Sequence, residues 1–128
     1  MLIKDKTHQK GRLAEAAFLY ACARYNWGIV TPFLTPLTYD FAIFMSQEAG
    51  WVTVQCKYAG RHRRRQASGR SLVSLRRNKN QFYKEGDFDL LFVYCGETHN
   101  GWLIPKCQLQ GKGEITPAHK RFDEYRIL

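Results

Sequence analysis

An isolated acidic residue lies inside an apolar stretch of the sequence. Asp40 occurs within residues 37–45, where its neighbours are aromatic or aliphatic residues and a threonine. Burying an unpaired carboxylate is costly, so Asp40 requires a cation, a metal ion or solvent. In the next apolar stretch, 51–58, Gln55 and Lys57 are two positions apart and therefore share one face of a predicted strand. A carboxylate, an amide oxygen and an ammonium group could together hold Mg²⁺ and stabilise charge developing on a phosphate.

The register of the predicted hairpin decides whether Asp40 joins the other two side chains. Residues 46–50 supply the turn between the two strands. Two registers with four-residue loops, a common hairpin length, place Asp40 opposite Gln55 or Lys57 and on their face. A five-residue loop would place it opposite Cys56 and on the other face. The sequence leaves these alternatives open.

A helix is predicted over residues 7–25, ahead of the hairpin. The expected apolar stripe recurs at helical spacing and consists of Leu13, Ala17, Tyr20 and Ala21. Asn26 can end this helix in the left-handed conformation.

Further strands are expected after the first helix, and the strongest is 88–94, whose near-continuous apolar run suggests a central, doubly buried position. Residues 77–85 are predicted to form a short helix or turn. The remaining predicted strands are 29–34, 71–75 and 102–105. This order predicts an α/β fold with a mixed sheet, built as a single domain over residues 1–128.

Positive charge is concentrated in one third of the chain. The 128 residues include 20 Lys and Arg against 11 Asp and Glu, a net charge of +9, and no acid occurs between Ala49 and Lys84. Such a region suits the phosphate backbone of double-stranded DNA, although a solvated loop that aids solubility is the plainer alternative. The candidate DNA-binding residues are Arg61, Arg63, Arg64, Arg65, Arg76 and Arg77.

Several other classes of protein are disfavoured. The longest strongly apolar run, 90–95, is too short to span a bilayer, and we expect no membrane partner. The four cysteines and four histidines lack the spacing of a zinc finger. We therefore expect reduced thiols and a cytoplasmic location.

The order of these residues resembles the PD-(D/E)XK nuclease superfamily. Segment 10–15 (KGRLAE) corresponds to its first-helix motif, Asp40 to its Asp, and 55–57 (QCK) to its (D/E)-x-K triplet. The sequences of segments 83–89 and 102–105 resemble one branch of this superfamily, which includes small homing endonucleases encoded in group I introns. Two departures are Tyr39, where the family has Pro, and Gln55, where it usually has an acid. The Gln variant also occurs in the intron-encoded branch.

The resemblance implies a restriction-endonuclease-like fold: a mixed β-sheet flanked by helices, with the first helix followed by a strand hairpin. It implies a Mg²⁺-dependent endodeoxyribonuclease, with Mn²⁺ as a substitute, that cuts both strands of a specific DNA site as a homo-oligomer, a dimer or tetramer. Its metal ligands would be Asp40, Gln55 and Glu15, and Lys57 would activate water. Glu15 could instead be a surface acid paired with Arg12.

Other readings remain open. Asp87 and Asp89 are rival carboxylates, for which we favour roles at a turn or strand start. A Holliday-junction resolvase shares the implied fold, but such enzymes normally keep an acid where Gln55 stands. A non-catalytic basic nucleic-acid-binding protein would explain the charge alone.

Overall fold

The computed structural model describes residues 6–33, 38–61, 71–78, 81–84 and 86–128. Its first element is α1 (Lys6–Tyr25). The helix ends at Asn26, which adopts a left-handed conformation with φ of 57°. The main-chain N–H of Trp27 then donates to the carbonyl of Cys22 at 2.9 Å, a helix-terminating bond. The predicted end of the helix is therefore confirmed.

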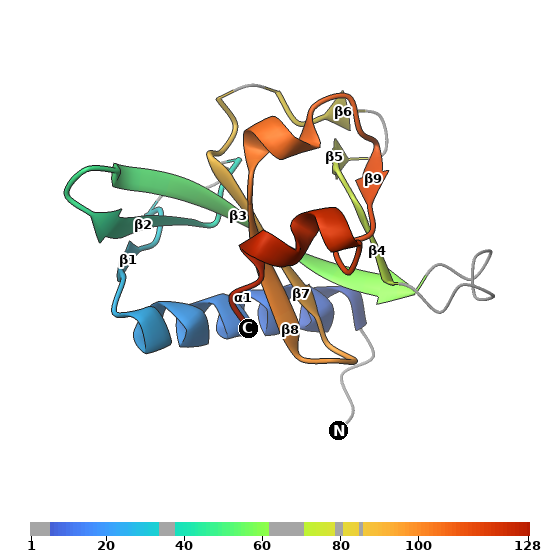
Figure 1. The fold of residues 1–128 in the computed structure, drawn as a ribbon, viewed down its shortest axis with the longest axis horizontal. Coiled ribbons are helices and arrows are strands. Elements are labelled where there is room, and N and C mark those ends of the chain that lie inside the picture. Colours follow the sequence, from blue (N-terminus) through green and yellow to red (C-terminus); the bar gives the residue numbers. More distant parts are fainter. Residues whose placement is uncertain (1–5, 34–37, 62–70, 79–80, 85) are drawn as a thin grey trace.

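A mixed sheet forms the centre of the fold (Figure 1). The long strand β3 (Gly50–Arg61) pairs antiparallel with β2 (Phe41–Ser46) and parallel with β7 (Leu90–Cys95). Antiparallel strands lie at both edges, β1 (Gly28–Val30) beside β2 and β8 (Asn100–Pro105) beside β7. This is the expected α/β arrangement of a helix followed by a strand hairpin.

The far end of β3 carries an extension of the sheet. Its last residues pair with β4 (Ser71–Ser74), which in turn pairs with β9 (Glu114–Ile115). Two 3-10 helices, η2 (Lys106–Leu109) and η3 (Lys120–Tyr125), follow β8 and β9 respectively. They lie on the opposite side of the sheet from α1 (Figure 1).

Each face of the sheet has its own apolar core. On one face, α1 packs Ala14 and Phe18 against Phe41, Val54 and Phe92, and the Phe18 ring lies 5.0 Å from that of Phe92. The second core is formed by the opposite faces of β7 and β8 with Leu109 and Phe122. Because β7 contributes to both cores, the central position predicted for it is confirmed.

The apolar stripe predicted for α1 was wrong by one residue. Leu13 and Tyr20 are 45% and 61% exposed, whereas the buried residues are Ala14, Phe18, Ala21 and Cys22. The observed stripe has the same spacing as the predicted one, so periodicity could not distinguish them. A shift of one residue rotates a helix face by roughly 100°. This rotation moves Glu15 from the far side of the helix to the flank of its buried face.

The helix considered for residues 77–85 was also wrong. The described residues there form two short strands, β5 (Arg76–Asn78) and β6 (Gln81–Phe82), which pair antiparallel. Strands of two or three residues are too short to show a period.

Elsewhere, no helix in the described ranges combines the length and the apolar character needed to cross a membrane.

Candidate active site

The β2–β3 hairpin has the register that places Asp40 opposite Gln55. Phe41 lies opposite Val54, and the main-chain N–H of Asp40 donates to the Val54 carbonyl at 2.9 Å. The pairing shifts by one residue before the turn, so Ser46 rather than its neighbour lies opposite Gly50. This closing pair leaves a loop of three residues instead of the expected four, and without the bulge it would place Asp40 opposite Cys56. The bulge therefore sets the register at the candidate site.

The candidate site lies where β3 changes partners. Pairing with β2 ends at Val54, and pairing with β4 begins at Gly60. Between these points the N–H of Cys56 donates to Oδ2 of Asp40 at 2.8 Å. A main-chain N–H points along the plane of its sheet. The Asp40 carboxylate therefore lies at the edge of β3. Strand alternation alone had placed it on the face that Gln55 and Lys57 share, and this expectation was wrong.

Asp40 and Lys57 share a partly buried environment. Burial raises the pKa of Asp40, and the Cys56 hydrogen bond and the Lys57 charge oppose this rise. Burial also lowers the pKa of Lys57, and the Asp40 charge opposes that change. Each group thus favours the charged form of the other, as expected for a carboxylate and an ammonium group held close together.

Glu15 approaches the same point from α1. Its pKa is raised by burial and by the negative charge of Asp40, while Arg12 lowers it. The Arg12 interaction expected for a surface acid is therefore present, together with a coupling to the site. Because α1 covers the face of β3 that carries Cys56, Glu15 and Lys57 approach Asp40 from opposite sides of the sheet.

The acidic residues alone do not form a metal cage. Among the described residues, no three His, Cys, Asp or Glu side chains are grouped as metal ligands. Gln55 occupies β3 between the positions that bond Asp40, at Val54 and Cys56. The potential ligands at this point are therefore two carboxylates and one amide, all hard oxygen donors.

The two rival carboxylates have structural partners. Asp89 accepts hydrogen bonds from the N–H and hydroxyl of Thr53, at 2.8 and 3.2 Å. Asp87 accepts from the N–H of Lys84 at 2.6 Å, which closes a turn. These contacts agree with the roles at a turn and a strand start favoured for them.

The predicted DNA-binding residues are only partly covered by the structure. Arg61 ends β3, and Arg76 and Arg77 lie in β5. Arg63, Arg64 and Arg65 lie outside the described residues.

The four cysteines are free thiols, as expected.

Sequence reasoning missed one residue beside Lys57. The Lys57 Nζ lies 5.3 Å from the ring centre of Tyr83, within the range of a cation–π contact. The two residues are far apart in the sequence, and no periodic pattern connects them.

Comparisons with known proteins show the family and the fold of the chain. The chain matches the sequence model of the PD-(D/E)XK endonucleases over residues 5–119. A search of curated proteins found no match. Among solved structures, the bacterial homing endonuclease I-Ssp6803I has a similar fold, with a TM-score of 0.74 and 24% identity, covering 94% of this chain and 88% of that one. The fold is thus restriction-endonuclease-like, and the chain belongs to the PD-(D/E)XK endonuclease family of nucleases.

Proposed function

We propose that this nuclease is a Mg²⁺-dependent DNA endonuclease that cuts both strands at a specific site. The observation that carries the proposal is the hydrogen bond from the Cys56 N–H to the Asp40 carboxylate, beside Lys57. It holds a partly buried anion next to a cation at the point where β3 changes partners. Such an arrangement suits reactive chemistry better than it suits stability.

The donor set fits a hard divalent cation. Asp40, Glu15 and the Gln55 amide would hold Mg²⁺ through oxygen atoms. The Cys56 carbonyl is a further candidate, since in an extended strand it points to the same edge as the N–H that bonds Asp40. When bound, the ion would polarise the scissile phosphate and lower the pKa of a bound water.

The residues of the chain would supply the remaining steps. Lys57 would orient the attacking water and offset charge developing on the phosphate oxygens. Asp40, fixed by Cys56, would keep that ammonium group in place. Glu15 would add negative charge from the α1 side, and this charge would compensate for the neutral amide of Gln55, which stands where the family usually has an acid.

The charge and size of the chain support a DNA substrate and an assembly. A net charge of +9 favours a polyanion, and the basic segment between residues 57 and 84 would contact phosphates. One chain offers one candidate site, so cutting both strands requires at least a dimer. The similar fold of a bacterial homing endonuclease supports site-specific cleavage over the other options.

A cleavage assay tests this function. We expect the protein to nick and linearise supercoiled plasmid in Mg²⁺ or Mn²⁺ and to stop in excess EDTA. Lys57→Met should slow cleavage by about 10²–10³-fold while DNA binding persists. Lys120→Met, in the exposed start of η3, is the matched control and should cut normally. Undiminished cutting in EDTA would overturn the proposal, and cutting of four-way junctions alone would support the resolvase reading.

A further inference from the structure

The Lys57 ammonium group lies over an aromatic ring from a distant part of the chain. Lys57 belongs to β3, whereas Tyr83 follows β6. The 5.3 Å separation between Nζ and the ring centre is within the range in which a ring face attracts a cation. The Tyr83 ring can thus influence where the Lys57 ammonium group lies, and Lys57 is the cationic side chain assigned to the candidate site.

Packing holds the Tyr83 ring, and hydrogen bonds hold the main chain next to it. Its neighbour Phe88 is 3% exposed and belongs to the second core, and the two rings meet edge to face at 4.9 Å. The Lys84 carbonyl accepts hydrogen bonds from the N–H of Asp87 at 3.1 Å and from Nζ of Lys106. The main chain next to Tyr83 is therefore anchored to both the turn before β7 and the start of η2.

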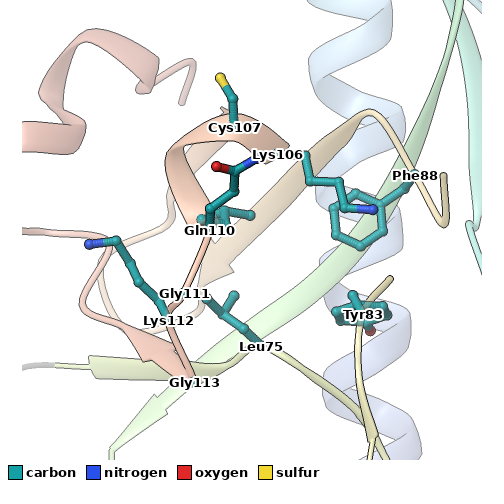
Figure 2. A pocket seen from close by; sticks show the side chains of 10 residues that line it. Leu75, Tyr83, Phe88, Lys106, Cys107, Gln110, Gly111, Lys112 and Gly113 are labelled. Atoms are coloured by element: carbon teal, nitrogen blue, oxygen red, sulfur yellow. The ribbon is translucent and has the colours of Figure 1, made fainter. Parts of the chain in front are cut away.

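A pocket borders the ring. It has a volume of about 540 Å³, and Tyr83, Phe88 and Lys106 contribute to its wall (Figure 2). The Nζ of Lys106 lies 5.1 Å from the Phe88 ring centre. A chain of contacts therefore runs from Lys106 through the Phe88 and Tyr83 rings to Lys57 at the candidate site. Removing the Tyr83 ring would add its space to the pocket and leave the Lys57 ammonium group without this surface.

We propose that Tyr83 is a positioning residue that holds the Lys57 ammonium group beside Asp40. The role in cleavage rests on the proposed nuclease function, whereas the holding of Lys57 is a property of the folded chain. The aromatic face supplies the contact, so phenylalanine should replace tyrosine at this position and an aliphatic residue should not.

Kinetics test the role in cleavage. Tyr83→Leu should lower the single-turnover rate at saturating DNA by about tenfold to a hundredfold, because misplacing a reacting group is costly. Its dissociation constant for DNA should stay unchanged. Tyr83→Phe should keep the wild-type rate. Tyr125→Leu is the control, because Tyr125 is a partly buried tyrosine packed on the same core. Equal rates for Tyr83→Leu and the wild type would overturn the proposal.

Nuclear magnetic resonance tests the contact without any activity. Protons over an aromatic face are shifted upfield, so the ε-methylene protons of Lys57 should be shifted upfield in the wild type and in Tyr83→Phe. The shift should vanish in Tyr83→Leu and remain in Tyr125→Leu. An unshifted Lys57 in the wild type would overturn the proposal, even if the enzyme cuts DNA. A shifted Lys57 in a protein that cuts no DNA would sustain the contact and reject the proposed function instead.

Discussion

At the residue scale, hydrogen bonds hold Asp40 in a partly buried environment that disfavours its charged form. Its N–H donates to Val54, and its carboxylate accepts from the N–H of Cys56. Burial nevertheless raises the pKa of the carboxyl, which means that the folded chain favours its neutral form. A charged group kept where it lowers stability is typical of a functional site.

Replacing this carboxylate with an amide should not destabilise the protein at neutral pH. Asp40→Asn keeps an oxygen for the Cys56 N–H and removes the desolvated charge. We expect its free energy of unfolding at pH 7 to equal or exceed that of the wild type. The difference should shrink as the pH falls toward 4, because a raised folded-state pKa favours the folded wild type once Asp40 is protonated. Urea unfolding at several pH values measures this effect.

Asp89→Asn provides the comparison for this measurement. Asp89 also accepts from a main-chain N–H of β3, that of Thr53, but it is an exposed residue. Losing its charge-assisted bonds should lower stability by about 1 kcal/mol. If Asp40→Asn were the more destabilised of the two variants, the view of Asp40 as a costly site residue would be wrong.

Gln55 should tolerate a carboxylate but not an aliphatic side chain. Gln55→Glu has nearly the same shape and restores the more usual triplet of the family. It should cleave DNA and require less Mg²⁺ for half-maximal activity, although repulsion from Asp40 and Glu15 offsets part of that gain. Gln55→Leu has no oxygen donor and should be inactive. Mg²⁺ titrations of cleavage compare the variants, and an active leucine variant would remove Gln55 from the ligand set.

At the scale of elements, the rotation of α1 places Glu15 near Asp40. Phe18 is fully buried against the sheet, whereas Tyr20 is 61% exposed. Phe18→Ala should therefore cost about 3–5 kcal/mol of unfolding free energy. Tyr20→Ala should cost less than about 1 kcal/mol. Chemical denaturation of both variants checks the orientation, and the reverse order of effects would restore the stripe through Leu13 and Tyr20.

The hairpin of the candidate site was predictable because strand alternation has a strict period of two. The positions of Gln55 and Lys57 follow from that period once the strand is recognised. The pairing of Asp40 with Gln55 was one of the registers expected for a four-residue loop, but the loop in the structure has three residues. The bulge before Ser46 was not predictable, and it is what brings Asp40 opposite Gln55 from this shorter loop.

The parts that sequence reasoning missed depend on contacts between distant segments. Two apolar stripes one residue apart fit α1 equally well, and only packing against the sheet decides between them. The pair β5–β6 is too short for a pattern. The contact between Tyr83 and Lys57 arises from how the chain returns to β3, which no local spacing encodes.

At the scale of the whole molecule, the net charge of +9 should control DNA affinity through salt. If Arg64 and Arg65 contact phosphates, replacing both with Gln should reduce the log–log salt slope of binding by up to about two units. Affinity for target and random duplexes should fall alike. Fluorescence anisotropy at several salt concentrations measures the slope. An unchanged slope would direct the search for the DNA surface to Lys10, Arg12 and β5.

The central claim is that the Asp40 site carries out metal-dependent cleavage, and paired variants test it most directly. Plasmid cleavage in Mg²⁺ should be compared for the wild type, Asp40→Asn and Asp89→Asn, each shown to be folded and to bind DNA. We predict that the wild type and Asp89→Asn cut, and that Asp40→Asn binds DNA but cuts slower by about 10²-fold or more. Cleavage by Asp40→Asn at the wild-type rate would contradict the claim and place the active site elsewhere.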